Sequence, residues 1–320
     1  MAIVAVFPGQ GAQEPGMGRA LAETFPAARE VFEEVDEALG EKLSRLIFEG
    51  PAGELTLTRN AQPALMATAL AAVRAVESLL GERLSGSLAF VAGHSLGEYS
   101  ALAAAGALEV GEAARLLRLR GEAMQEAVPV GEGAMAAILG LGVEVVEEVA
   151  AVAAQGEVCE LANDNADGQA VVSGHRTAVE RAVAIAKARG AKRAVMLEVS
   201  APFHCSLMAP AAERLAAALA EAELRDPAVP LVANVTASPV RDAAAIRRLL
   251  VEQVTARVRW RETMAFLCEA GVRHLAESGA GRVLVGLARR ALPGVALHSV
   301  RDPAEAEALA RTLETVLQEA

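Results

Sequence analysis

Short apolar runs typical of strands alternate along this chain with long alanine-rich segments typical of helices. The clearest such runs, residues 3–7, 88–92 and 230–234, are short and rich in aliphatic residues, as strands are. This alternation is typical of an α/β fold with a mostly parallel sheet. Because 320 residues exceed the size at which one hydrophobic core usually stops growing, we expect a large domain and a second, smaller one.

The middle of the chain follows a different order of elements. Its periodicity predicts a strand, a helix, two strands, a second helix and a last strand. These elements are predicted at residues 133–141, 143–154, 157–162, 169–174, 177–189 and 193–199. The order βαββαβ is that of a ferredoxin-like unit. We therefore predict a small domain over 131–198 that interrupts a large domain formed by 1–130 and 199–320.

Charge and cysteine content exclude several classes of protein. The formal net charge of −11 argues against a nucleic-acid binder, which would need a basic surface. Cys159, Cys205 and Cys268 are widely spaced, so we expect no disulfide framework, no metal site, and a reducing cytoplasm. No uncharged apolar stretch reaches the roughly 18 residues of a membrane span, and no signal-peptide pattern is present, so we expect no membrane partner.

A glycine-flanked serine stands between a predicted strand and a predicted helix. Ser95, between Gly93 and Gly97, follows the apolar run 88–92 and precedes an alanine-rich segment. This is the context of a nucleophile elbow, where small neighbours allow a sharp turn that exposes the hydroxyl. The helix amino end and the Leu96 amide would then face a developing oxyanion. An ordinary strand-to-helix turn is the alternative, and the context favours a nucleophile.

Ser95 needs a general base, and two histidines compete for that role. His204 lies in a proline-containing loop after a predicted strand, and loops at strand ends carry chemistry in α/β proteins. The α/β-hydrolase order of serine, acid and histidine favours instead His298 with Asp226 or Asp242. The second arrangement would make the protein a serine esterase or thioesterase. Spacing alone leaves the choice open.

An arginine falls on the apolar face of the helix predicted over 111–127. Arg120 shares that face, whereas Arg115 and Arg118 lie around on the other side and are expected to be solvated. A buried guanidinium must be paired, because an unpartnered buried charge is strongly destabilising. An internal salt bridge or a cluster of carbonyl groups would satisfy Arg120. So would a substrate carboxylate bound by two parallel hydrogen bonds.

Two other segments partly match ligand-binding motifs, but each has the wrong residue at a required position. Gly9 and Gly11 begin a dinucleotide fingerprint, but Glu14 occupies the third glycine position and would repel a pyrophosphate. The loop is better interpreted as one whose amides approach a ligand oxygen. Residues 163–168 match the first half of a calcium loop, but its twelfth position is Gly174 instead of glutamate. A hairpin turn rich in asparagine and aspartate explains this segment.

Several motifs in a fixed order make the chain similar to a known family over nearly its whole length. They are FPGQG at 7–11, NAQPA at 60–64, GHSLGEYSAL at 93–102, RG at 120–121 before MQ at 124–125, ANDN at 162–165, PFHC at 202–205, and EQ at 252–253 before VRW at 258–260. The chain thereby resembles the malonyl-CoA:acyl carrier protein transacylases. The resemblance implies an α/β-hydrolase-like domain interrupted by a ferredoxin-like one.

The resemblance also implies a reaction and the residues that perform it. It implies ping-pong transfer of a malonyl group from malonyl-CoA to the phosphopantetheine thiol of acyl carrier protein, through a malonyl-serine ester and without a cofactor. Ser95 and His204 are implied as a catalytic dyad, with the main-chain carbonyl of Gln253 orienting the imidazole. The amides of Gln10 and Leu96 are implied as the oxyanion hole.

Substrate contacts follow from the same resemblance. Arg120 would bind the malonyl carboxylate and Gln62 would donate a hydrogen bond to the substrate. Phe203, beside the histidine, would exclude an α-methyl group, although one methyl is worth only about 1–3 kcal/mol of discrimination. Since a strand starts directly after Met1 and the chain ends in a helix, we expect a discrete, monomeric enzyme of bacterial fatty acid synthesis rather than part of a larger synthase.

Arginines gather near the carboxyl end of this acidic chain. Residues 241–261 hold six arginines and only two acidic residues. Because acyl carrier proteins are acidic and CoA carries phosphates, an acidic enzyme needs a local basic surface to meet them. We predict a docking surface formed by Arg247, Arg248, Arg289 and Arg290. The alternative is an ordinary solvated helix face.

Overall fold

A computed structural model describes residues 2–318 and contains two sheets. The larger has six strands in the order β10-β9-β1-β2-β7-β8. Its strands are β1 (Ala2–Phe7), β2 (Phe90–Gly93), β7 (Leu231–Ala233), β8 (Ser238–Val240), β9 (Val272–Ser278) and β10 (Ala296–Val300). All neighbours are parallel except β8, which pairs antiparallel with β7 at one edge. The mixed α/β fold with a mostly parallel sheet is thus confirmed.

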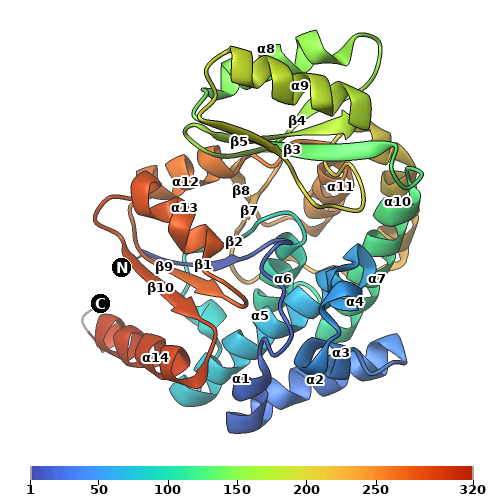
Figure 1. Cartoon of the computed structure of the whole chain (residues 1–320). Coiled ribbons are helices and arrows are strands. Elements are labelled where there is room, and N and C mark those ends of the chain that lie inside the picture. The colour runs from blue at the N-terminus through green and yellow to red at the C-terminus, as the bar shows by residue number, and fades with distance from the viewer. Residues whose placement is uncertain (1, 319–320) are drawn as a thin grey trace.

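Strand β1 shows why its sequence is apolar throughout. Ile3 and Phe7 pack into one hydrophobic core, whereas Val4 and Val6 pack into another on the opposite face of the sheet. Alternate residues of a strand point to opposite faces, so a strand covered by helices on both faces has no polar positions. Figure 1 shows helices on both sides of this sheet, which places β1 at the centre of the large body.

Helices of the large body surround this sheet. They are α1 (Arg19–Thr24), α2 (Pro26–Leu39), α3 (Leu43–Glu49), α4 (Ala52–Thr56), α5 (Thr58–Leu80), α6 (Gly97–Ala104), α7 (Val110–Glu126), α10 (Ala209–Glu221), α11 (Ala243–Gln253), α12 (Trp260–Glu269), α13 (Val283–Ala291) and α14 (Pro303–Gln318). Helix α5 is long and apolar enough to cross a membrane, but 78% of its apolar window is buried inside the protein. Because α2, α6, α7 and α14 pack around it, its composition is that of a central core helix.

The second sheet has four antiparallel strands in the order β4-β5-β3-β6. Its elements are β3 (Gly133–Leu139), α8 (Val143–Ala154), β4 (Cys159–Ala166), β5 (Gln169–His175), α9 (Arg176–Ala188) and β6 (Arg193–Met196). This is the predicted order of elements, and α8 has the predicted bounds. Helices α8 and α9 cover the outer face (Figure 1), while Met135 and Val171 on the other face join the core of the large body.

The prediction of a turn over 163–168 is wrong, because the turn is shorter than expected. Strand β4 runs on to Ala166, and only 167–168 turn. Asp164 donates its amide to Val258 O at 3.0 Å, and its carboxylate pairs with Arg261 at 2.9 Å. The polar residues therefore lie in a strand because they contact the segment before α12, a contact that local sequence does not indicate. The last predicted strand also stops early, at Met196, which leaves an irregular segment leading to His204.

Candidate active site

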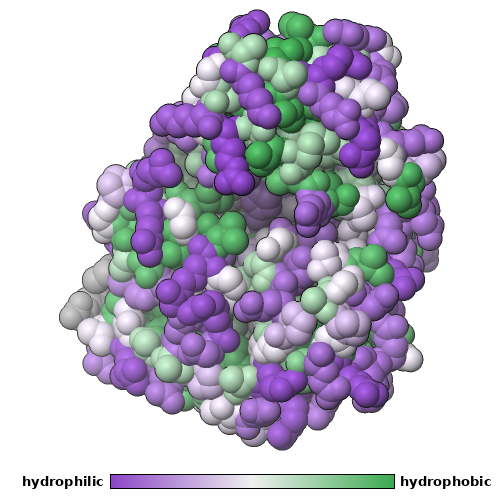
Figure 2. Space-filling view, viewed as in Figure 1, coloured by the Kyte–Doolittle hydropathy of each residue, from purple (hydrophilic) through white to green (hydrophobic). Residues whose placement is uncertain are grey.

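A cavity of about 320 Å³ opens between the two sheets. Figure 2 shows it as a hollow between the small upper part and the large lower part of the molecule. The loops that follow β1 and β2 reach it, as expected for the carboxyl ends of adjacent parallel strands. The predicted site residues that line it are Gln10, Gln62, Ser95, Leu96, Arg120, Phe203 and His204.

Ser95 sits on a turn that only small neighbours permit. Its φ is 54°, in the left-handed region, which is unfavourable for a residue with a side chain and recurs at functional sites. A Cβ on Gly93 would lie 1.9 Å from the carbonyl carbon of Gly97, and one on Gly97 would lie 2.3 Å from Phe7 O. Both glycines are therefore required for the sharp strand-to-helix turn that presents the hydroxyl.

The serine hydroxyl meets His204 rather than any other histidine. Ser95 Oγ lies 2.7 Å from His204 Nε2, and His204 Nδ1 lies 2.8 Å from the main-chain carbonyl of Gln253. A carbonyl oxygen can only accept, so Nδ1 carries the proton and Nε2 is left to accept the serine proton. Burial, followed by the nearby charge of Arg120, lowers the pKa of His204 to about 3. The imidazole is thus held as a neutral base.

This shift predicts an unusual pH profile. If His204 kept the ordinary histidine pKa of 6.5, half of the base would be lost at that pH, whereas a pKa of about 3 keeps it neutral. We expect the rate of Ser95 acylation to show no acid limb from His204 between about pH 8 and pH 5. Rapid-quench measurement of acyl-enzyme formation across this range checks the prediction. A halving of the rate near pH 6.5 would contradict it.

The lowered pKa of His204 also makes the stability of the folded protein depend on pH, and the assay must control for this. The unfolded chain binds a proton at His204 below about pH 6.5, whereas the folded protein does not until about pH 3. The free energy of unfolding therefore falls as the pH falls through that window. Melting temperatures recorded at each pH will separate loss of fold from loss of base.

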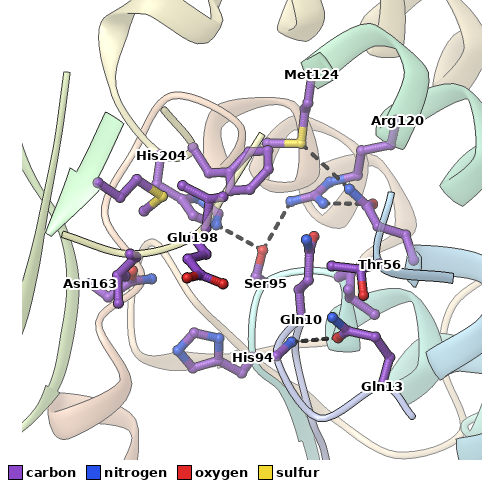
Figure 3. Close-up of a pocket in the computed structure, with 17 residues that line it drawn as sticks. Gln10, Gln13, Thr56, His94, Ser95, Arg120, Met124, Asn163, Glu198 and His204 are labelled. Atoms are coloured by element: carbon purple, nitrogen blue, oxygen red, sulfur yellow. Dashed lines mark hydrogen bonds between the residues drawn. The ribbon is translucent and has the colours of Figure 1, made fainter. Parts of the chain in front are cut away.

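Arg120 is the charged group of the site, with only 2% of its surface exposed. Its Nη1 donates to Gln62 Oε1 at 2.8 Å, and its Nη2 donates to Ser95 Oγ at 3.1 Å, the contact drawn between the two labelled residues in Figure 3. Nη2 also donates to Gln253 Oε1 at 2.9 Å. Among residues 2–318 no carboxylate contacts this guanidinium, and Nε has no partner. The internal salt bridge considered from sequence is absent there, whereas two side-chain carbonyl oxygens accept from the guanidinium, as the alternative of a carbonyl cluster predicts. Arg118, predicted to be solvated, is half-buried and pairs with Glu41.

The predicted oxyanion hole is placed at the cavity. Gln10 and Leu96 both line it, on the loops that follow β1 and β2. Within the described part of the chain, neither main-chain amide donates a hydrogen bond to a protein acceptor. Two unoccupied N–H groups beside a nucleophile can stabilise the oxygen of a tetrahedral intermediate. Phe203, 9% exposed, borders the same space next to the histidine.

The competing serine–acid–histidine arrangement is not assembled. His298 stacks on His274, with 3.3 Å between Nε2 of the first ring and Nδ1 of the second. Asp242 accepts a hydrogen bond from an amide in the first turn of α11, and Asp226 accepts one from the amide of the first residue of that helix. Each of these residues has a local role, and none lines the cavity at Ser95.

The four docking arginines fall into two pairs on different elements. Arg247 and Arg248 lie on α11, which follows the edge strand β8 and packs on α10. Arg289 and Arg290 lie on α13, which packs on β9 and β10 at the opposite edge of the sheet. Arg247 is half-buried and donates to Ala222 O at 3.2 Å. The structure therefore does not join the four into one surface.

Three residues that contribute to the site were missed from the sequence. Asn234 accepts from the Ser95 amide at 2.8 Å and donates to Gly93 O at 2.6 Å, so it fastens the elbow. Glu98 is buried beneath the elbow, and burial raises its pKa to about 8. Glu198 is exposed and lines the cavity, with its carboxylate directed inward (Figure 3). For Asn234 and Glu98, the signal available in the sequence is a polar residue within an otherwise apolar predicted strand or helix.

A serine–histidine pair and a buried guanidinium that contacts no carboxylate within residues 2–318 are the arrangement expected of an enzyme that forms an acyl-serine from a substrate with a carboxylate. A family model for the acyl transferase domain matches residues 4–293. The "Malonyl CoA-acyl carrier protein transacylase" of Bacillus subtilis (strain 168) is 48% identical over 314 residues, 98% of this chain and 97% of that protein. The chain therefore belongs to the malonyl-CoA:acyl carrier protein transacylase family of acyltransferases.

Solved structures of similar proteins superpose closely on this chain. An acyl-carrier-protein-S-malonyltransferase from Bartonella henselae is 54% identical and superposes with a TM-score of 0.96, and the alignment covers 98% of this chain and 100% of the other. A second match comes from the structure of a type II PKS acyl-carrier protein in complex with its malonyl-transacylase. The matched chain of that complex is 43% identical and superposes with a TM-score of 0.92, and the alignment covers 98% of this chain and 100% of the other.

Proposed function

We propose that this protein transfers the malonyl group of malonyl-CoA to the phosphopantetheine thiol of acyl carrier protein. The observation that carries the proposal is the buried Arg120, whose guanidinium reaches Ser95 Oγ at 3.1 Å and has no carboxylate partner among residues 2–318. An acyl group that brings its own carboxylate would complete this arrangement. The names of the relatives support the same substrates.

The first half-reaction uses the dyad. His204 Nε2 takes the proton of Ser95 Oγ as that oxygen attacks the thioester carbonyl, and the amides of Gln10 and Leu96 receive the oxyanion. The C–S bond breaks, the proton on Nε2 passes to the departing CoA sulfur, and a malonyl-serine ester remains. In the second half-reaction the carrier thiol gives its proton to Nε2 and attacks the ester, and Ser95 recovers a proton as the ester bond breaks.

Substrate selection uses residues that line the cavity. Arg120, which lines the cavity, would bind the malonyl carboxylate with its guanidinium. Gln62, which accepts from Arg120 Nη1 at 2.8 Å, would hydrogen-bond on the substrate side. Phe203 beside the histidine would disfavour a branched malonyl group, by about 1–3 kcal/mol at most for one methyl.

The same proposal includes the finer description of the fold and setting. We assign 1–130 and 199–320 to an α/β-hydrolase-like domain and 131–198 to a ferredoxin-like one. The strand order β4-β5-β3-β6 of the small sheet supports the second assignment. The reaction needs no cofactor besides the thioester substrate itself, and we place it in cytoplasmic fatty acid synthesis, performed by a monomer.

Carrier docking is expected to use the arginine pairs separately. We expect Arg248→Glu, and Arg289→Glu with Arg290→Glu, each to raise the KM for carrier protein several-fold at low salt, because an acidic partner is steered by local positive charge. Acylation of Ser95 by malonyl-CoA should be unchanged. Steady-state kinetics against carrier concentration measure the effect. Arg311→Glu on α14, at 67% side-chain exposure, is the matched control. If charge reversal of a pair changes the KM for carrier protein no more than Arg311→Glu does, that pair belongs to the ordinary solvated surface.

Intact-mass spectrometry of the two half-reactions tests the proposed function. Malonyl-CoA alone should add one malonyl group to the enzyme, and holo carrier protein should then remove it and gain the same mass. Rapid loss of the acyl group to water without carrier protein would identify a thioesterase instead. A chain that binds carrier protein but never gains mass would be an inactive scaffold, and the proposal would fail.

A further inference from the structure

A buried carboxylate beneath the site touches neither the serine hydroxyl nor the histidine ring. We propose that Glu98 is a positioning residue that acts through the side-chain amide of Gln253: it selects the orientation of that amide and so holds Arg120 where a substrate carboxylate can reach it. The inference rests on the proposed function and extends it to a residue outside the cavity lining.

The contacts form a single chain from carboxylate to guanidinium. Glu98 is 1% exposed, and its Oε1 accepts from the Asn234 amide at 2.7 Å. Its Oε2 accepts from Gln253 Nε2. The other end of the same amide, Gln253 Oε1, accepts from Arg120 Nη2 at 2.9 Å. Because Gln253 is fully buried, solvent does not compete for either end of its amide.

The orientation of this amide has chemical consequences. As it stands, its NH₂ group faces a carboxylate and its carbonyl faces a guanidinium, so every contact joins a donor to an acceptor. The reverse orientation would set two donors against each other at Arg120 and would turn the Gln253 carbonyl toward the Glu98 oxygen that now accepts from it. An acceptor at position 98 therefore favours the orientation in which the carbonyl faces the guanidinium. Gln253 Nε2 also donates to Ser95 O at 2.9 Å, so the same orientation supports the elbow.

The arrangement also places one neutral amide between the Glu98 carboxyl group and the Arg120 guanidinium. One end of the Gln253 amide contacts Glu98 and the other contacts Arg120, so the two side chains do not meet directly. A direct salt bridge would satisfy Arg120 and occupy the fork that the substrate needs. With Gln253 between them, the guanidinium is hydrogen-bonded by a neutral group, and no carboxylate among residues 2–318 occupies it. The Gln253 amide thus reconciles burial of an arginine with its availability to a ligand.

A buried carboxylate could instead serve the fold alone, and the chain offers a matched control for that role. Glu277 on β9 is completely buried, and its carboxylate accepts from the amides of Leu284 and Val285 at 3.0 and 2.7 Å. These contacts fasten the start of α13 and have no connection to Arg120. Replacing either glutamate by glutamine keeps shape and removes one acceptor, so the two variants should cost similar stability.

The experiment compares Glu98→Gln with Glu277→Gln in the full chain. Acylation of Ser95 by malonyl-CoA and by acetyl-CoA is measured by rapid quench, with melting temperatures alongside. Glutamine at position 98 has one acceptor oxygen for two donors, the Asn234 amide and Gln253 Nε2, so the pair is no longer fully satisfied and the Gln253 amide is held less firmly against Arg120. We expect the malonyl-to-acetyl ratio of kcat/KM to fall about 10-fold or more, mostly through the KM for malonyl-CoA. Glu277→Gln should leave the ratio unchanged.

A second variant keeps the test decisive if Glu98→Gln folds poorly. Gln253→Met removes the amide through which Glu98 acts and keeps most of the side-chain length, so it should lower the malonyl-to-acetyl ratio by a similar factor. An unchanged ratio in Glu98→Gln or in Gln253→Met, or an equal fall in Glu277→Gln, would overturn the inference. Failure of wild-type enzyme to accept malonyl groups would overturn the proposed function instead, so the two failures are distinguishable.

Discussion

Ser95→Ala protein incubated with malonyl-CoA is expected to keep its unmodified mass, and His204→Ala is expected to acquire the malonyl group about 100- to 10,000-fold more slowly than wild type. Removing Oγ removes the only atom that can form the ester. Removing the imidazole leaves Oγ without the acceptor that lies 2.7 Å away, although the oxyanion amides remain. Acyl-enzyme formation followed by intact mass measures both effects.

His298→Ala provides the matched control for His204→Ala. His298 stacks on His274 between adjacent strands and lies outside the cavity lining, so acylation should proceed at the wild-type rate. Collapse of activity in His298→Ala together with survival in His204→Ala would reverse the assignment of the base. Melting temperatures of all three variants exclude unfolding as the cause of any loss.

Local periodicity accounts for the parts of the fold that the sequence predicts well. Helix α8 has the predicted bounds, and α7 differs by one residue at each end, because each buries one continuous apolar face. Ser95 is equally local: a strand, two glycines and a helix within a few residues define its turn. Strand β4 was predicted too short because its last residues are held by Val258, almost a hundred positions away in sequence.

The remainder of the site depends on contacts between distant segments. His204 and Ser95 are 109 positions apart, and nothing in the spacing distinguishes His204 from His298. The partners of Arg120 come from α5 and α11, and Glu98 meets Asn234 across 136 positions. Such pairings arise only when β7, α6 and α11 assemble, so the resemblance to a family identified the base where pattern could not. The docking arginines illustrate the converse, because clustering along the sequence did not place them on one surface.

Arg120→Ala is expected to lower kcat/KM for malonyl-CoA about 100- to 1,000-fold while leaving acylation by acetyl-CoA within about threefold of wild type. In the proposed function the guanidinium binds the carboxylate that distinguishes malonyl from acetyl, and it does so from a buried position where solvent competes little. The loss should therefore appear as a change of selectivity, in contrast to Ser95→Ala, which removes both reactions. Parallel acylation assays with the two thioesters measure the ratio.

A variant that fills the space of the Arg120 side chain without its charge should lose malonyl transfer but not stability. Arg120 carries a buried charge whose hydrogen bonds go to neutral groups, and among residues 2–318 its Nε has no partner and no carboxylate contacts it, so its desolvation cost is only partly offset in the folded protein. Arg120→Met keeps most of the volume without that charge, and we expect its melting temperature to equal or exceed that of wild type although malonyl transfer is lost. A marked fall in melting temperature would show that Arg120 supports the fold, and unchanged selectivity would remove it from substrate binding.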